Sequence, residues 1–272
     1  MSTIAGNILK MKSHYQDAHT PVSYSLPIGK EEVKLNEYIG KTIRLNFSGQ
    51  INCIASGEEI KKSYNQGYSY KSFISLARCD MCIVRPELCH FDKGTCREPE
   101  WGEKNCMIPH YIYLSISSNL KVGITRHTQI PTRWIDQGAV AGLPILKVGD
   151  RKTSGLIESE LSKDFSDRTN WRKMLKGEHE EVDLMSVRDQ LFEDYADLID
   201  SYGAEDIDEG PTFIEYPSIL SKGEVPPSLK SLSFDKTAQV EGTLLGIKGQ
   251  YLIFDVGVLN LRKHQGYFLQ LS

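Results

Sequence analysis

Five cysteines lie within residues 79–106, in the stretch CDMCIVRPELCHFDKGTCREPEWGEKNC, and this cluster constrains the fold of the 272-residue chain more than any other feature. Cys79 and Cys82 form a Cys-x-x-Cys pair, which on a tight turn supplies two of four tetrahedral metal ligands at small loop-closure cost. The stretch is rich in Pro and Gly and poor in apolar residues. Because it has no core of its own, we expect a bound metal to hold it in place.

The candidate ligands of this metal are five thiols and one imidazole. The set that the spacing favours is Cys79, Cys82, Cys89 and Cys96, with Cys106 and His90 as competitors. Four thiolates typically bind structural Zn²⁺, which makes zinc the expected ion. An iron–sulfur cluster also accepts four thiolates, and the spacing does not exclude it. The remaining alternative is a set of free, buried cysteines.

A second, weaker pattern precedes the cluster. Cys53 and Ser56 have Cys-x-x-Cys spacing, and so do Ser69 and Ser72 further along. A neutral hydroxyl is a poor ligand for zinc, so three serines do not replace three thiolates. The pattern indicates either a pair of zinc-ribbon-like hairpins without their metal or a coincidence.

The composition is that of an ordinary globular protein, with 40% hydrophobic and 25% charged residues. No apolar run approaches the length of a membrane span, and the N-terminal residues lack a secretory signal core. We therefore expect a cytoplasmic protein, in which clustered cysteines serve as metal ligands or redox thiols rather than as disulfides.

The net charge of −4 conceals two segments of opposite sign. Residues 121–176 carry eleven Lys and Arg against six Asp and Glu, whereas residues 177–224 carry two basic and fifteen acidic residues. A basic segment favours an anionic partner, and we expect nucleic acid, DNA or RNA. The candidate contact residues are Arg126, Arg151, Lys152 and Arg172.

Strand-like patterns lie at both ends of the chain, and helical patterns lie between them. This predicts an α+β fold in which N- and C-terminal strands form one β-rich unit, with an inserted Cys-rich metal-binding loop and a small α/β core. The predicted parts are a β-rich region with zinc-ribbon-like hairpins (1–76), the Cys-rich loop (77–110), the α/β core (111–176), an acidic helix and loop (177–212) and a C-terminal β region (213–272).

The segment YIYLSISSNLKVGIT, residues 111–125, predicts two short strands joined by a turn at 117–119. Because side chains alternate along a strand, Tyr111 and Tyr113 share one face. Lys121 and Gly123 likewise share one face of the second strand. Arg133 follows them, and Glu158 lies on the next predicted helix.

These residues resemble a known family. The sequences YIY, KVGITR, TRW and IESEL are similar to the core of the GIY-YIG nuclease superfamily, over about a quarter of the chain. A larger pattern, which adds the cysteine stretch, PTRWIDQGA and SDRTNWRKML, resembles an uncharacterised bacterial family, domain of unknown function 2797. That second resemblance spans most of the chain but brings no activity with it.

The nuclease resemblance implies a role for each matching residue. Tyr113 would orient or deprotonate the attacking water, Lys121 would stand where many members have a second tyrosine, and Gly123 would let the backbone approach the site. Arg133 would contact the scissile phosphate. Glu158 would hold a catalytic Mg²⁺ or Mn²⁺. The chain departs from the pattern at Tyr111, where the first motif has glycine, and only Asn170 is available as the final asparagine.

The predicted function is therefore a metal-dependent phosphodiesterase acting on DNA or RNA, with a structural zinc site. The alternative is a non-catalytic, zinc-containing adaptor that binds nucleic acid or associates with tRNA. A cysteine-based redox or iron–sulfur protein is a third reading, which would leave the Tyr, Lys and Arg cluster without a role.

Overall fold

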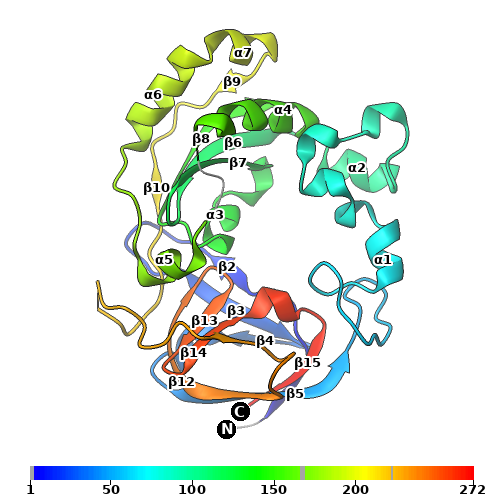
Figure 1. Ribbon diagram of the computed structural model, residues 1–272, viewed down its shortest axis with the longest axis vertical. Helices are drawn as coiled ribbons and strands as arrows, with labels where there is room; N and C mark the ends of the chain where they lie inside the picture. Colours follow the sequence, from blue (N-terminus) through cyan, green and yellow to red (C-terminus); the bar gives the residue numbers. More distant parts are fainter. Residues whose placement is uncertain (1–2, 166–168, 222) are drawn as a thin grey trace. The chain divides into compact units, whose positions relative to one another are not determined.

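The computed structural model describes residues 3–165, 169–221 and 223–272, and in these ranges the chain is a mixed α+β protein (Figure 1). The chain divides into two compact units. Unit 1 comprises residues 1–74, 175–177 and 214–272, and unit 2 comprises residues 75–174 and 178–213. The α+β class predicted from the sequence is confirmed.

Unit 1 is built around a seven-stranded sheet with the order β1-β15-β5-β12-β13-β14-β11. Its strands are β1 (Ile4–Asn7), β5 (Thr42–Ile51), β11 (Ser231–Leu232), β12 (Gln239–Lys248), β13 (Tyr251–Phe254), β14 (Gly257–Asn260) and β15 (Tyr267–Leu271). The long strand β5 lies between β12 and β15 and pairs antiparallel with both. The predicted association of N- and C-terminal strands is confirmed.

A second, three-stranded sheet completes the unit 1 core. It contains β2 (Lys12–His14), β3 (Ser23–Ile28) and β4 (Glu31–Lys34), followed by a 3-10 turn at Leu35–Tyr38. The two sheets meet where Ile8 bridges Ile28. At this point a Cβ on Gly6 would lie 2.4 Å from the Cα of Gly29, so only glycine lets the two backbones approach this closely.

Unit 2 contains an antiparallel sheet with the order β10-β8-β6-β7, and β9 pairs with β8. Its strands are β6 (His110–Ile116), β7 (Leu120–Arg126), β8 (Ala141–Val148), β9 (Glu205–Asp206) and β10 (Thr212–Phe213). The hairpin of β6 and β7 turns at residues 117–119, as predicted, and its register places Tyr113 opposite Gly123.

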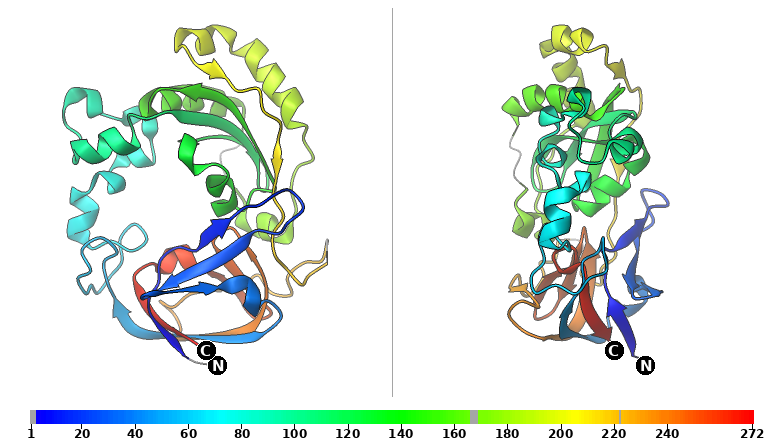
Figure 2. Two further views of the ribbon diagram at one scale, coloured as in Figure 1. Left: turned by 180° about the vertical axis from the view of Figure 1, so that it is seen from behind. Right: turned by 90° about the vertical axis from the view of Figure 1, so that its right-hand side faces the viewer.

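The two faces of this sheet differ in chemistry. One face packs its aliphatic side chains, including Ile112 and Leu114, against Ile157 and Leu161 of helix α4 (Arg151–Leu161). The other face carries Tyr113, whose ring contacts Trp134 edge-on at 5.8 Å. Helix α4 and helix α3 (Thr132–Asp136) lie on opposite faces of the sheet (Figures 1 and 2).

The acidic stretch forms two helices rather than the single predicted one. These are α6 (Leu184–Asp194) and α7 (Ala196–Ser201), and Tyr195 between them has non-helical φ and ψ of −120° and 20°. Its hydroxyl donates a hydrogen bond to Asp164 at 2.5 Å. This tertiary contact lies where the helix breaks, and the periodicity of the stretch does not reveal it.

The cysteine-rich stretch consists of short turns and one helix. The turns are 3-10 helices at Ala77–Cys79, Met81–Ile83, Pro86–Leu88 and Phe91–Lys93, and the helix is α2 (Pro99–Asn105). Two further helices of the chain, α1 (Tyr70–Ser75) and α5 (Trp171–Lys176), lie before and after this region.

Helix α4 forms the support on which the cysteine-rich turns pack. A Cβ on Gly155 would lie 2.5 Å from the Cβ of Pro86 and 2.6 Å from the backbone nitrogen of Glu87. The Arg151 backbone nitrogen donates to the Cys106 carbonyl at 2.8 Å. On the same helix, Lys152 forms an ion pair with Asp92 at 2.7 Å.

We expect Gly155→Ala to destabilise unit 2. Helix propensity alone would favour alanine by about 1 kcal/mol, but the added methyl group overlaps backbone of the cysteine loop and should cost about 1–3 kcal/mol through overpacking. Thermal unfolding measures the balance, with Ser159→Ala at an exposed site of the same helix as the control. An unchanged or raised melting temperature would show that the loop does not pack tightly on α4.

Candidate active site and metal centre

Tyr113 is the centre of the first polar cluster in unit 2. Its side chain is only 1% exposed, and its hydroxyl donates a hydrogen bond to Gln137 at 3.2 Å. The Arg133 guanidinium lies within hydrogen-bonding reach of the same hydroxyl. A Cβ on Gly123 would lie 2.7 Å from the Tyr113 oxygen, so the ring is accommodated only because this position of β7 has no side chain.

Burial is the main influence on the Tyr113 phenol. It raises the pKa of Tyr113, Arg133 opposes the rise, and the negative charge of Glu158 adds to it. The phenol is therefore neutral near neutral pH and donates a proton to a hydrogen bond. Arg133 thus lies within hydrogen-bonding reach of the Tyr113 hydroxyl and Glu158 acts on it through its charge, so three of the four residues predicted as catalytic influence one phenol.

The fourth predicted residue, Lys121, is half-buried on β7, opposite Ser115 in the hairpin register. Gly123 lies between Lys121 and Thr125 on the same strand face, as the alternation of side chains requires. Glu158 is half-buried on α4, one turn after Gly155.

Arg126 and Arg151 extend the positive charge around Arg133. Desolvation is the main cause that lowers the pKa of Arg151, and the charges of Arg126 and Arg133 lower it further. Arg126 in turn donates a hydrogen bond to the Asn105 side chain. Positive charge therefore gathers on the side of the sheet where β7 ends and α4 begins, which suits an anionic ligand.

The predicted nucleic-acid contacts have different environments. Arg151 donates hydrogen bonds to the carbonyls of Cys82 and Ile83, at 3.4 and 2.7 Å, and Lys152 pairs with Asp92, so both hold the cysteine loop. Arg172 is exposed and stacks over Trp171 at 4.3 Å. Asn170 accepts hydrogen bonds from the backbone nitrogens of Arg172 and Lys173 at the start of α5.

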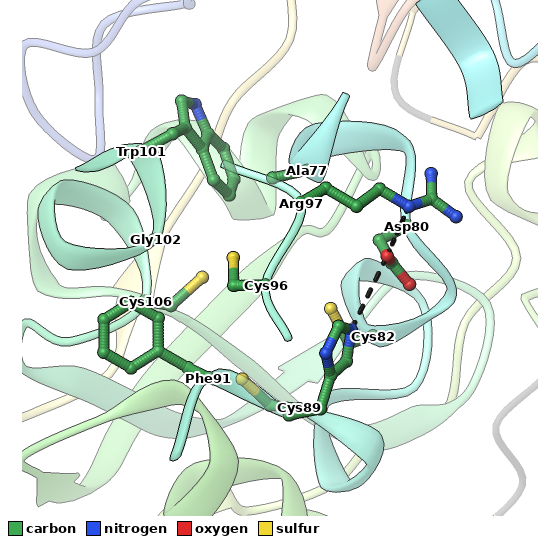
Figure 3. A pocket seen from close by; sticks show the side chains of 11 residues that line it. Ala77, Asp80, Cys82, Cys89, Phe91, Cys96, Arg97, Trp101, Gly102 and Cys106 are labelled. Atoms are coloured by element: carbon green, nitrogen blue, oxygen red, sulfur yellow. Dashed lines mark ion pairs between the residues drawn. The ribbon is translucent and has the colours of Figure 1, made fainter. Parts of the chain in front are cut away.

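A second candidate site lies within the cysteine loop. Cys82, Cys89, Cys96 and Cys106 line one pocket together with His90 (Figure 3). The volume open to the centre of a water-sized sphere is about 10 Å³, enough for a single water or ion and far too small for a substrate. Cys79 is buried but is not among the residues that line this pocket.

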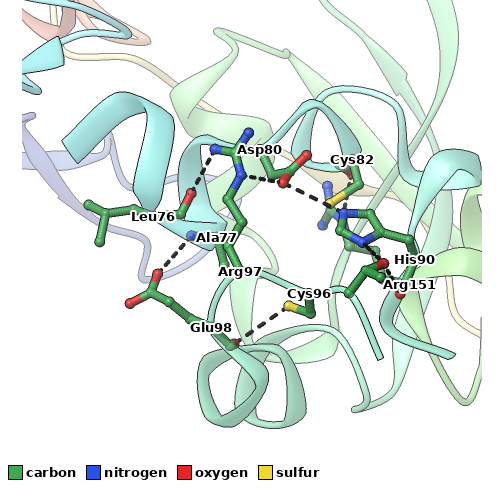
Figure 4. A network of polar contacts seen from close by, with 10 residues as sticks. Leu76, Ala77, Asp80, Cys82, His90, Cys96, Arg97, Glu98 and Arg151 are labelled. Atoms are coloured by element: carbon green, nitrogen blue, oxygen red, sulfur yellow. Dashed lines mark hydrogen bonds and ion pairs between the residues drawn. The ribbon is translucent and has the colours of Figure 1, made fainter. Parts of the chain in front are cut away.

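One side of this pocket contains a mixed set of donors. Ligand atoms of Asp80, Cys82 and His90 lie within 4.8 Å of one another. Asp80 accepts from Arg97 at 2.6 Å and faces His90 Nε2 at 3.6 Å (Figure 4). His90 Nδ1 lies 2.7 Å from the Thr95 hydroxyl, which itself donates to the His90 carbonyl. In the tautomer of His90 that is protonated at Nδ1, the ring donates to this hydroxyl and Nε2 presents a lone pair that could bind a metal ion.

Two thiols of the pocket, those of Cys82 and Cys106, have raised pKa values and are therefore protonated near neutral pH. Burial raises the pKa of Cys82 to about 11, and it also raises the pKa of Cys106. A divalent metal would reverse this, because a coordinating thiol is deprotonated outright. The four thiols fit a soft metal such as zinc, whereas Asp80, Cys82 and His90 would fit a borderline ion with mixed ligands.

The serine-containing pattern of unit 1 also comes together in space. Cys53 Sγ and Ser72 Oγ lie 3.4 Å apart, and Ser69 and Ser72 hydroxyls lie 3.2 Å apart. The sulfur also accepts hydrogen bonds from Ser56. Burial by itself raises the pKa of the Cys53 thiol, but the hydrogen bonds outweigh it and lower this pKa to about 6.

The ionised Cys53 should make stability depend on pH. Its folded-state pKa of about 6 lies below its ordinary value of 9.0, so its contribution is full above about 9 and is lost as pH falls through about 6. We expect the difference in unfolding free energy between wild type and Cys53→Ser to grow with pH across this window. Urea unfolding under reducing conditions measures it, and a difference independent of pH would contradict the thiolate.

Replacement of the three serines by cysteine should create a metal site. The variant carrying Ser56→Cys, Ser69→Cys and Ser72→Cys would place four thiols around one point, and we expect it to bind one more Zn²⁺ per chain than wild type. Native mass spectrometry counts the ions, with Ser63→Cys, outside the cluster, added to wild type as the control. Equal zinc content in variant and wild type would show that these side chains do not converge closely enough.

Three residues in or beside these sites were not predicted from the sequence. Asp80 lies inside the Cys-x-x-Cys pair, and a carboxylate between two candidate ligands is a signal that could have drawn attention to it. Gln137, the hydrogen-bond acceptor of Tyr113, follows α3 in a segment with no recognisable motif. The buried His110 is also new; its Nδ1 donates to the Ile108 carbonyl, and desolvation lowers its pKa to about 4, which keeps it neutral.

Fold and site together define a mixed α+β protein with a cysteine-lined pocket and a candidate metal-binding group. The chain belongs to a family described as "Protein of unknown function (DUF2797)", whose model matches residues 40–269, and the corresponding resemblance seen in the sequence is confirmed. No curated protein and no solved structure matches it. Within the part of the chain that the structure describes, no helix has the length and apolar character needed to cross a membrane.

Proposed function

We propose that this protein is a metal-dependent phosphodiesterase with a GIY-YIG-like core, acting on DNA or RNA and stabilised by a structural zinc ion in the cysteine loop. The observation that carries the proposal is that a guanidinium and a carboxylate from two helices both act on one buried phenol. Arg133 lies within hydrogen-bonding reach of the Tyr113 hydroxyl, and the charge of Glu158 acts on the same hydroxyl.

The placement of the motifs supports the GIY-YIG resemblance. Tyr113 and Lys121 stand on the paired strands β6 and β7, and Arg133 and Glu158 stand on the helices α3 and α4, so each matching motif falls on a regular element of one small α/β core. Gly123 matches the glycine of the second motif, and a glycine is needed there because any side chain would overlap the Tyr113 ring. Both features are local, so they support the core and say nothing about the substrate.

The chemistry of hydrolysis assigns each side chain a task. Water forms the new bond to phosphorus as the bond to the leaving oxygen breaks, and negative charge grows on the phosphate oxygens. Arg133 would stabilise that charge with planar, paired donors. The Tyr113 hydroxyl, held by Gln137, would orient the water. Glu158 would be a protein ligand of Mg²⁺ or Mn²⁺, which supplies Lewis-acid assistance when bound.

A non-catalytic adaptor that binds nucleic acid is the second candidate, and two observations favour it. Tyr113 is 1% exposed, so its hydroxyl has little access to solvent water. Trp171 and Arg172 stack on one another and line a polar hollow with Asn119 and Lys173, and aromatic rings and guanidinium groups are the side chains on which nucleic-acid bases stack. These features suit binding without cleavage.

Substitution of the converging residues tests the proposal. We expect wild type to nick nucleic acid in the presence of Mg²⁺ or Mn²⁺, and we expect Arg133→Ala and Glu158→Gln each to lower kcat by about 100-fold or more, because each removes charge stabilisation in the transition state. Glu160→Gln, two residues along the same helix, is the matched control. Single-turnover cleavage of end-labelled DNA and RNA, with folding checked by circular dichroism, measures the effect.

The same experiment separates the two candidates. Binding of nucleic acid without cleavage of any substrate in a broad panel would favour the adaptor. Activity that survives in Glu158→Gln would overturn the assigned role of the carboxylate. Neither result would bear on the metal of the cysteine loop.

A further inference from the structure

We infer that Cys82, Cys89, Cys96 and Cys106 bind one zinc ion as four thiolates, that Cys79 is not a ligand, and that Arg151 is the positive counter-charge of this centre. The inference deepens the structural metal of the proposed function and does not depend on phosphodiesterase activity. It replaces the ligand set that the spacing favours, which contains Cys79 and omits Cys106.

The lining of the pocket carries the first step. Four cysteines from separate turns and from the end of α2 line a single pocket (Figure 3), and Cys79 is not among its lining residues. The four sulfur atoms do not all lie within 4.8 Å of one another, so binding of the ion would draw them together. The pocket has room for one ion only, whereas a cluster of several iron and sulfide atoms would need far more space. A mononuclear site is therefore the better fit.

Charge decides between the four thiols and the mixed group. Asp80, Cys82 and His90 with a divalent ion would form a neutral centre, since the carboxylate and thiolate cancel the metal charge. Four thiolates with the same ion carry two negative charges. Asp80 is already engaged by Arg97 at 2.6 Å, so its negative charge has a partner without the metal. Asp80 and His90 thus flank the thiols rather than compete with them.

Arg151 supplies the independent evidence for a negative centre. Its partly buried guanidinium is bonded to two carbonyls of the cysteine loop, and its charge acts on Cys82 and Cys106. Among the residues that the structure describes, no carboxylate forms an ion pair with it. A partly buried cation without an acidic partner is costly, and thiolates formed on metal binding would offset that cost.

The metal centre would in turn fix helix α4. The Arg151 side chain bonds the loop at Cys82 and Ile83, and its backbone nitrogen bonds the loop again at Cys106. Both cysteines are proposed ligands. Binding of the ion therefore orders the residues that hold the first turn of the helix on which Glu158 stands.

X-ray absorption of the zinc-loaded wild type tests the ligand set without any substitution. We expect a first shell of four sulfur atoms at about 2.3 Å. A shell that contains nitrogen or oxygen would overturn the set in favour of Asp80 and His90. Iron with acid-labile sulfide in the purified protein would overturn it as well.

Cobalt titration followed by thiolate-to-metal absorption then identifies the ligands. Cys79→Ser should bind one Co²⁺ with the wild-type spectrum, whereas Cys106→Ser should lose intensity in proportion to the missing thiolate or fail to bind. Full binding by Cys106→Ser together with loss in Cys79→Ser would restore the set expected from spacing.

The role of Arg151 needs its own pair of variants. We expect Arg151→Gln to weaken Co²⁺ binding about 10- to 100-fold, the range found when groups around metal ligands are removed, and Arg151→Lys to keep part of the affinity because it keeps the charge. Arg85→Gln, an exposed arginine of the same loop, is the control. Wild-type affinity in Arg151→Gln would refute the counter-charge.

Discussion

The packing of the cysteine loop on helix α4 is the contact on which the rest of unit 2 depends. The loop has few apolar residues of its own, and it is held by the close approach at Gly155, the ion pair of Lys152 and the bonds of Arg151. The same helix buries Ile157 and Leu161 in the core of the sheet. One short helix therefore joins a region that we propose to be stabilised by a metal to a region stabilised by hydrophobic burial.

The second constraint is the crossing of Tyr113 over Gly123 in the β6–β7 hairpin. The absence of a side chain at Gly123 lets the phenol lie flat against the neighbouring strand, where Gln137 and Arg133 reach it. This precise seating buries the hydroxyl almost completely. The geometry that makes the residue a well-positioned hydrogen-bond donor is thus the same geometry that limits its exposure to water.

Local patterns predicted much of the fold, and long-range contacts account for what they missed. Alternation along residues 111–125 gave the hairpin and the shared face of Lys121 and Gly123, because both depend only on strand period. The ligand spacing favoured Cys79, whereas the pocket is lined by Cys106 and not by Cys79, since spacing measures loop closure and cannot show which way a side chain turns. Gln137 and the break at Tyr195 depend on partners far away in the chain, which a single sequence does not display.

The position of β5 between β12 and β15 affects the order in which the two units fold while the chain is being synthesised. Both neighbours of this strand lie beyond residue 238, so the strand has no partner in its sheet while the intervening residues leave the ribosome. All of unit 2 is made in that interval, and it depends on contacts within itself. We therefore expect unit 2 to fold first, and the exposed edges of β5 to be the part of the nascent protein most in need of protection from aggregation.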